Sequence, residues 1–144
     1  MKNLILYVFV LVCLSSNSQN VEIGGWRDYL PYNDAVGVAK MDGKIYVATE
    51  NSLFYLDVEE ETLNRLSTVN GLSDVGISTM AKNPQKNTLV VAYNSAKIDI
   101  IENNSIYSML DIEMENIVGD KSINKIVFNN NNACLLYTSD AADE

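Results

Sequence analysis

An acidic cluster of four carboxylates, Asp57, Glu59, Glu60 and Glu61, has the residue type that could bind a cation. Hard cations such as Ca²⁺ prefer oxygen ligands, and carboxylates supply them. The cluster also lies between two runs of strand-forming residues, where charged side chains are typical of a solvated turn. We favour the solvated outer turn, and we predict no metal and no cofactor for this chain.

A second group of candidate residues is aromatic, because Trp26, Tyr29 and Tyr32 fall within one short stretch. Aromatic faces stack against the C–H groups of sugars, so such a cluster could bind a carbohydrate. In a strand the same side chains more often pack in a core, and we favour packing. Arg27 is expected to pair with a carboxylate such as Asp28.

The composition argues against several function classes. The chain has no histidine, which removes the commonest general base and the commonest metal ligand. Its net charge is −9, with no basic stretch, which argues against nucleic acid as a partner. A hydrolase or lyase would need convergent acids, bases or metals, and none is assembled. We assign no catalytic residue and predict that the protein is not an enzyme.

The N-terminus has the layout of a secretory signal peptide. Lys2 precedes an unbroken apolar run from Leu4 to Leu14, and Ser16 and Ser18 stand where a cleavage site has small residues. The run is too short for a stable membrane-spanning helix, although a membrane anchor is the alternative. We predict that residues 1–18 are a cleaved signal and that the protein is exported.

The C-terminal stretch CLLYTSDAADE, residues 134–144, matches a synthetic DNA sequence rather than a protein motif. Read back into codons, it fits the transposase adapter used to prepare sequencing libraries, translated in frame. We predict that it is an adapter-derived artefact and that the authentic sequence breaks off near Ala133, so we exclude it from fold reasoning. A natural acidic tail is the alternative.

Both cysteines belong to these two ends of the chain. Cys13 leaves with the signal, and Cys134 belongs to the C-terminal stretch. Lipid attachment at Cys13 is disfavoured because Val12 stands where a lipoprotein signal has a very small residue. An exported domain without disulfides must be held together by its core alone.

Residues 19–133 read as β-structure almost throughout. We predict strands from the β-branched and aromatic runs at residues 44–50, 52–58, 88–94, 97–102, 105–112 and 123–128. No amphipathic helix is predicted. Asp42-Gly43 predicts a hairpin turn, because both central residues of such a turn reach positive φ.

These strands recur as a group. One copy begins at Ala35, a second at Gly76 and a third at Ile123, and Ile45 corresponds to Leu89, 44 residues later. A period of about 40–50 residues with four strands per unit is the signature of a β-propeller blade. The predicted fold class is all-β, an incomplete β-propeller with two four-stranded blades and the start of a third.

The stretch NGLSDVGISTMAKNP, residues 70–84, resembles the repeat of the two-component-regulator type of propeller, in which a Gly-Leu-Ser turn precedes the inner strand. Gly71 permits positive φ at this turn, and Leu72 is expected to fill the gap between neighbouring blades. Asp74 is expected to cap the turn with its carboxylate, and the alternative is that it lines the axial mouth.

The stretches WRDYLPYNDAVGVA, ATENSLFYLD and TVNGLSDVGIST together resemble the PorZ-like family of type IX secretion propeller proteins, over Ile23 to Phe128. This resemblance implies a non-enzymatic protein at the outer surface of the outer membrane. It implies an attachment complex with the sortase PorU and with PorV and PorQ, in which anionic lipopolysaccharide is delivered to the sortase for cargo anchoring. The alternative is the periplasmic, carbohydrate-sensing propeller of a hybrid two-component histidine kinase.

Two blades cannot close a ring, because propellers close with about four to eight blades. The uncovered blade face would be a large apolar patch. We therefore predict that the chain is insoluble or disordered when expressed alone, and that GGWRDYLPY, residues 24–32, is the strand that completes the last blade.

Overall fold

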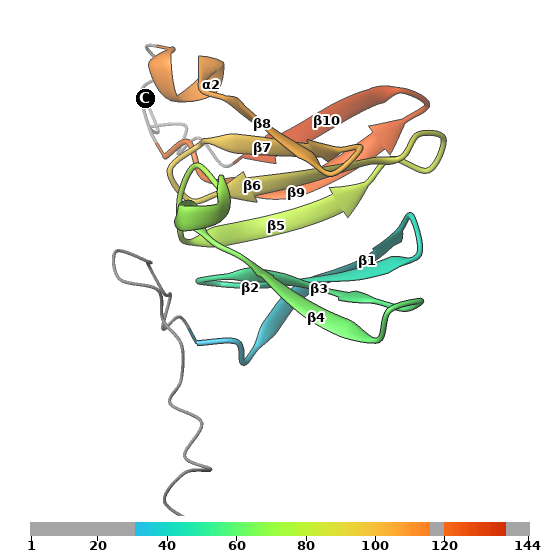
Figure 1. Ribbon diagram of the computed structural model, residues 1–144. Helices are drawn as coiled ribbons and strands as arrows, with labels where there is room; N and C mark the ends of the chain where they lie inside the picture. The colour runs from blue at the N-terminus through green and yellow to red at the C-terminus, as the bar shows by residue number, and fades with distance from the viewer. Residues whose placement is uncertain (1–30, 116–119, 138–144) are drawn as a thin grey trace, which may run out of the picture.

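The computed structural model describes residues 31–115 and 120–137, which form two four-stranded antiparallel sheets and a two-stranded hairpin (Figure 1). Each four-stranded sheet is a meander in which strands adjacent in sequence are hydrogen-bonded neighbours. The first sheet contains β1 (Ala35–Met41), β2 (Lys44–Thr49), β3 (Leu53–Asp57) and β4 (Thr62–Leu66).

The second sheet repeats this arrangement, and a hairpin follows it. The second sheet contains β5 (Ile77–Lys82), β6 (Thr88–Tyr93), β7 (Ile98–Glu102) and β8 (Ser105–Met109). The hairpin pairs β9 (Ile123–Asn129) with β10 (Asn132–Tyr137). The first strands of the three units lie side by side, β1 beside β5 and β5 beside β9. This is the arrangement of propeller blades around an axis, and it confirms the predicted incomplete β-propeller.

The short turns between strands have the predicted chemistry. Asp42 and Gly43 have φ of 49° and 71°, so both central residues of the β1–β2 turn are left-handed, as the Asp-Gly pair predicts. Asn103 and Asn104, between β7 and β8, have φ of 49° and 61°. Asparagine tolerates this region better than other residues that carry a Cβ, which explains its use here.

The hydrogen-bonding registers reproduce the sequence repeat residue by residue. The register shifts between Ala35 and Gly37 in the first sheet and between Ile77 and Thr79 in the second, 42 residues further on. In each sheet the first residue after the bulge pairs with a fully buried alanine of the neighbouring strand. Gly37 pairs with Ala48, and Thr79 pairs with Ala92. The repeat found in the sequence is therefore a structural repeat, bulges included.

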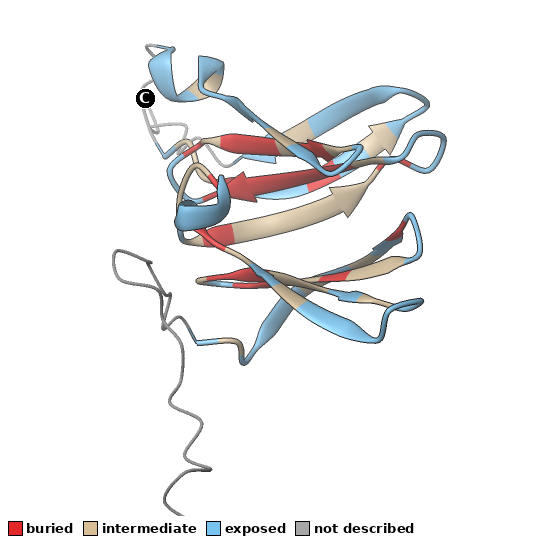
Figure 2. Ribbon diagram, in the orientation of Figure 1, coloured by how far each residue is buried: buried red, intermediate tan, exposed pale blue. Residues whose placement is uncertain are grey.

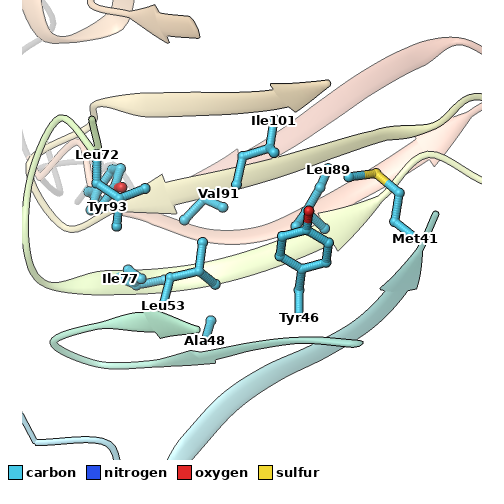
Figure 3. Close-up of a cluster of buried hydrophobic side chains, with 10 residues drawn as sticks. All are labelled: Met41, Tyr46, Ala48, Leu53, Leu72, Ile77, Leu89, Val91, Tyr93 and Ile101. Carbon is cyan, nitrogen blue, oxygen red and sulfur yellow. The ribbon is translucent and has the colours of Figure 1, made fainter. Parts of the chain in front are cut away.

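One apolar core lies between the first and second sheets (Figure 3). Leu53 and Ala48 point up from the first sheet toward Ile77 and Val91 of the second. The buried members of this core are Met41, Tyr46, Ala48, Leu53, Leu72, Ile77, Leu89, Val91, Tyr93 and Ile101. A second core, between the second sheet and the hairpin, contains Val90, Ala92, Ile98, Ile123 and Ile126.

These two cores explain the sequence of β6. Leu89, Val91 and Tyr93 face the first sheet, whereas Val90 and Ala92 face the hairpin. Both faces of the strand are buried, so its sequence TLVVAY reads as a continuous apolar run rather than as an alternation. A blade in the interior of a propeller has this character.

On the face of the first sheet that points away from the second sheet, large apolar side chains stay exposed. Much of β1 and β4, the two edge strands of this sheet, is coloured as exposed in Figure 2. Val38 is 67% exposed and Leu63 is 57% exposed, although both are strand residues with large apolar side chains. Leu56 lies directly opposite Leu63 and is exposed as well. We call this surface, which also includes Val47 and Phe54, the outer face of the first sheet.

The predicted strand over residues 105–112 is too long. β8 ends at Met109, which pairs with Ile98 at the first residue of β7, so no partner strand remains beyond it. The chain continues into a single helical turn, α2 (Asp111–Met114), which the sequence did not predict. Ile112 of this turn packs against the second core, and that contact explains the change of direction.

At the C-terminal end, Cys134 to Tyr137 form part of β10, whereas the authentic sequence was expected to end near Ala133. Pairing of β10 with β9 rests on backbone groups that every residue other than proline possesses. The adapter origin of residues 134–144 stays a prediction. Residues 1–18, the predicted signal, lie outside the described residues.

Candidate functional site

The segment that links the two sheets contains the Gly-Leu-Ser turn. A short 3-10 turn, η1 (Thr68–Asn70), is followed by Gly71 with φ of 112°, and Gly76 has φ of 79° just before β5. The positive φ expected for Gly71 is thus confirmed. Leu72 is only 5% exposed and belongs to the core between the sheets, which confirms its expected role as a plug between blades.

A carboxylate that the sequence analysis missed lies beneath this turn. Asp99 of β7 is fully buried and accepts three hydrogen bonds. The donors are the Tyr93 hydroxyl at 2.6 Å, the Ser108 hydroxyl at 2.7 Å and the Ser73 backbone N–H at 2.8 Å. Burial, together with the neighbouring Asp99 carboxylate, raises the pKa of Tyr93 far above its usual value. The tyrosine therefore remains a donor at physiological pH.

This group, which we call the Asp99 network, connects β6, β7 and β8 with the linking segment. The sequence feature that could have indicated this network is the single aspartate, Asp99, in the apolar run KIDIIE, residues 97–102. In the first sheet the equivalent position, opposite Val47, is the apolar Phe54, whereas Asp99 lies opposite Val91. An acidic residue in an otherwise apolar strand predicts a buried hydrogen-bond acceptor.

Asp74 caps the turn as predicted and also contacts the β6–β7 turn. Its carboxylate accepts a 2.8 Å hydrogen bond from the Val75 N–H and another of 2.8 Å from the Ser95 hydroxyl. Lys97 Nζ lies 3.1 Å from the same carboxylate. Desolvation alone would raise the pKa of Asp74, but these hydrogen bonds and the lysine charge outweigh it and lower the pKa.

The acidic cluster forms an exposed turn, as expected. Asp57 Oδ1 accepts hydrogen bonds from the backbone N–H groups of Glu59 and Glu60, at 3.1 and 3.2 Å. Glu61 has φ of 53°, which reverses the chain into β4. Within the described residues, no group of three or more acidic or cysteine side chains is placed to hold a metal ion.

Tyr32 packs on the outer face of the first sheet, which confirms the packing interpretation for this residue. Its ring meets Phe54 edge-on at 5.7 Å, and the Arg65 guanidinium lies 4.8 Å from its centroid. The Pro31 carbonyl, just before it, accepts a 2.9 Å hydrogen bond from the Ser52 hydroxyl. The other residues of that prediction, Trp26, Arg27, Asp28 and Tyr29, lie outside the described residues.

A cleft of about 320 Å³ opens between the two sheets. Aromatic rings, aliphatic side chains and amides all contribute to its wall. The cleft is lined by Tyr46, Tyr55, Leu66, Asn70, Asn104 and Ile106, together with Gly71 and Ile101. We call it the inter-blade cleft. No sequence motif predicts this cleft, because its lining residues come from both sheets and from the segment that links them.

The polar groups of the inter-blade cleft are held in place by neighbours. Lys44 Nζ donates a 2.7 Å hydrogen bond to Asn104 Oδ1 and lies 4.8 Å from the centroid of Tyr55. The rings of Tyr46 and Tyr55 are 5.3 Å apart. Burial raises the pKa of Tyr46, and the negative charges of nearby acidic groups add to this. The Tyr46 hydroxyl is therefore neutral at physiological pH.

No helix among residues 31–115 and 120–137 is long and apolar enough to cross a bilayer.

Comparison with known proteins gives one family and one solved structure. A sequence profile of the N-terminal β-propeller domain of PorZ, from the type IX secretion system, matches residues 45–138. The solved structure is that of PorZ from Porphyromonas gingivalis, described as an essential bacterial surface component of that system; its TM-score is 0.66 at 22% identity, over 74% of this chain and 14% of that chain. At this identity the likeness shows the fold alone. Nothing among the curated proteins matches the chain.

Proposed function

The chain belongs to the family of PorZ N-terminal β-propeller domains of the type IX secretion system, and from this premise we propose that it serves as a non-enzymatic surface component of that system. The observation that carries the proposal is the family match over residues 45–138, which covers β2 to β4 of the first sheet, the whole second sheet and the hairpin. The repeated bulges and the continuous packing of the blades support membership of this family, because they are features of the propeller scaffold that the family has.

The finer role that we propose follows the family. The protein takes part in the attachment complex at the outer surface of the outer membrane, with the sortase PorU and with PorV and PorQ. It helps deliver anionic lipopolysaccharide to the sortase, which anchors secreted cargo. Residues 1–18 direct export and are removed, residues 19–133 are part of an N-terminal propeller, and residues 134–144 derive from an adapter.

The test uses the complete protein encoded at the locus, with an affinity tag, in its native host. We expect PorU, PorV and PorQ to co-purify with it from outer-membrane extracts, together with anionic lipopolysaccharide. Deletion of the gene should leave cargo unanchored and released into the medium. Co-purification with an inner-membrane kinase, without any of these partners, would instead place the protein among the sensor propellers.

A further inference from the structure

We propose that Leu30, just upstream of the described residues, fills a pocket on the outer face of the first sheet, as Leu72 fills the gap between the first and second sheets. This pocket, which we call the outer pocket, has a volume of about 230 Å³ and a mostly apolar wall. It is lined by Tyr32, Phe54, Leu63 and Arg65. The inference concerns the junction between blades and does not depend on the proposed role in secretion.

The first argument is the position of Leu30 in the repeat. β1 and β5 begin 42 residues apart, at Ala35 and Ile77, and their bulges have the same spacing. Leu30 precedes Ala35 by as many residues as Leu72 precedes Ile77. Leu72 is only 5% exposed and packs in the core between the two sheets. The repeat therefore assigns Leu30 the same place against the first sheet.

The second argument is that the outer pocket corresponds to the place where the linking segment contacts the second sheet. Leu63 is the second residue of β4, and its counterpart in β8 is Ile106. Ile106 packs against the core that contains Leu72, and a Cβ atom at Gly71 would lie 3.7 Å from Ile106 Cδ1. On the second sheet this place is therefore occupied by residues 71–72. On the first sheet it is the outer pocket.

The third argument is that a hydrogen-bonded pair of the second sheet is replaced as a pair in the first. The Ser73 N–H donates to the carboxylate of Asp99. At the corresponding places the first copy has Pro31, which has no N–H, and Phe54, whose side chain has no acceptor. Loss of only one member would leave a buried polar group unsatisfied, which is costly. The joint loss indicates that residues 30–32 contact the first sheet as residues 72–74 contact the second.

The fourth argument is the short distance from fixed residues to the outer pocket. The Pro31 carbonyl accepts a 2.9 Å hydrogen bond from the Ser52 hydroxyl, and the Tyr32 ring meets Phe54 at 5.7 Å. Consecutive Cα atoms are about 3.8 Å apart, so Leu30 is tethered close to the pocket that Tyr32 lines. Burial of a leucine in an apolar pocket removes the surface of both from water, which favours this occupant.

The first experiment measures proximity in the complete protein that carries this chain. Leu30→Cys is combined with Leu63→Cys, the protein is oxidised mildly, and mass spectrometry identifies the linked peptides. A disulfide requires Cα atoms within about 7 Å of each other. The control combines Ala35→Cys with Leu63→Cys, because β1 and β4 are the two edges of the sheet, roughly 14 Å apart. We expect a disulfide between positions 30 and 63 and none between positions 35 and 63.

The second experiment measures hydrogen–deuterium exchange of the same protein. Leu30→Ala should lower the amide protection of β3 and β4 about tenfold, because it empties the outer pocket. Leu30→Met should keep most of the protection, since methionine conserves the volume. Asn33→Ala, at an exposed residue on the other side of Tyr32, is the control and should change nothing.

The proposal is overturned if positions 30 and 63 form no disulfide, or if the control pair forms one as readily. It is also overturned if Leu30→Ala leaves β3 and β4 as well protected as Asn33→Ala does. That last result would follow if a residue of another blade fills the outer pocket.

Discussion

The Tyr93 hydroxyl donates a 2.6 Å hydrogen bond to the carboxylate of Asp99, and both residues are fully buried in the second sheet. A buried carboxylate is costly unless its oxygens are hydrogen-bonded. Asp99 meets this requirement with donors from Ser73 and Ser108 as well. The blade therefore contains a polar anchor that fixes where the linking segment meets it, and stability at this point depends on every partner being present.

We expect Tyr93→Phe to destabilise the second sheet by about 1.5–3 kcal/mol, because it removes one donor from a buried carboxylate. The measurement is hydrogen–deuterium exchange of the complete protein, in which the protection of the Ser73 amide should fall. The control, Tyr107→Phe, removes a hydroxyl from a residue that is 57% exposed and should change stability by less than about 0.5 kcal/mol. Equal protection in both variants would show that the Asp99 network contributes nothing to stability.

The contact between Asp74 and Lys97 predicts a local dependence on acid. The pKa of Asp74 is lowered in the fold, so the contact contributes stability above the ordinary carboxylate pKa of 3.8 and loses it as the pH falls through the lower, folded value. We expect the protection factor of the Val75 amide to be constant near neutral pH and to fall below about pH 4.

Two variants separate this contact from general acid unfolding. Asp74→Asn should lower the protection of the Val75 amide at neutral pH and remove most of its dependence on acid. Asp34→Asn changes an exposed acid that accepts a hydrogen bond from its neighbour Asn33, and it should leave the acid profile unchanged. An unchanged profile in Asp74→Asn would contradict the assignment.

Leu72 provides a test of blade-to-blade packing. Leu72→Ala should destabilise the junction of the two sheets by about 2–5 kcal/mol, because it opens a cavity in a buried core. Val69→Ala, three residues earlier in the same linker at 55% exposure, should cost less than about 0.5 kcal/mol. Thermal unfolding and the amide protection of β1 and β5 measure both changes. If the two variants behave alike, Leu72 is not a plug between blades.

The fold could be predicted from sequence where the pattern is local or periodic. The copies that begin at Ala35 and Gly76, the Asp42-Gly43 turn and the positive φ of Gly71 follow from hydrophobic periodicity and backbone chemistry. α2 could not be predicted, because its one turn depends on a tertiary contact of Ile112.

The candidate sites were harder to predict, because they are assembled from distant segments. Asn70 and Asn104 are separate turn residues in the sequence, and only the stacking of two blades brings them to one cleft. Asp99 could have been identified from its apolar surroundings, but its partners could not, since they come from the linker, β6 and β8.

Val38→Lys, on the outer face of the first sheet, should have opposite effects in the 144-residue chain and in the complete protein. In the 144-residue chain, Val38→Lys should raise the soluble fraction, because it places a charge in an exposed apolar patch. If a neighbouring blade covers this face in the complete protein, Val38→Lys should destabilise it by about 3–5 kcal/mol, because the lysine would be a buried, unpaired charge.

Val69→Lys, in the exposed linker, is the control and should change neither quantity. Fractionation after expression measures solubility, and thermal unfolding measures stability. A 144-residue chain that is soluble, monomeric and unfolds cooperatively without any substitution would contradict the prediction that the outer face needs a cover.

The last prediction concerns position 136. Leu136 lies opposite Lys125 beside a bulge, where the first two copies have Ala48 opposite Gly37 and Ala92 opposite Thr79. Both alanines are fully buried, whereas Leu136 is 48% exposed. A small residue at this point lets neighbouring blades approach closely, and a leucine in a complete third blade would overpack the core.

A long sequencing read across the locus tests this directly. If residues 134–144 derive from an adapter, we expect the frame to continue past codon 133 with a small residue at position 136, further blades and no CLLYTSDAADE. A read from an independent library made without a transposase is the control. If the genome itself encodes Leu136 and the acidic end, the adapter origin is wrong, and the third copy departs from the repeat for a structural reason of its own.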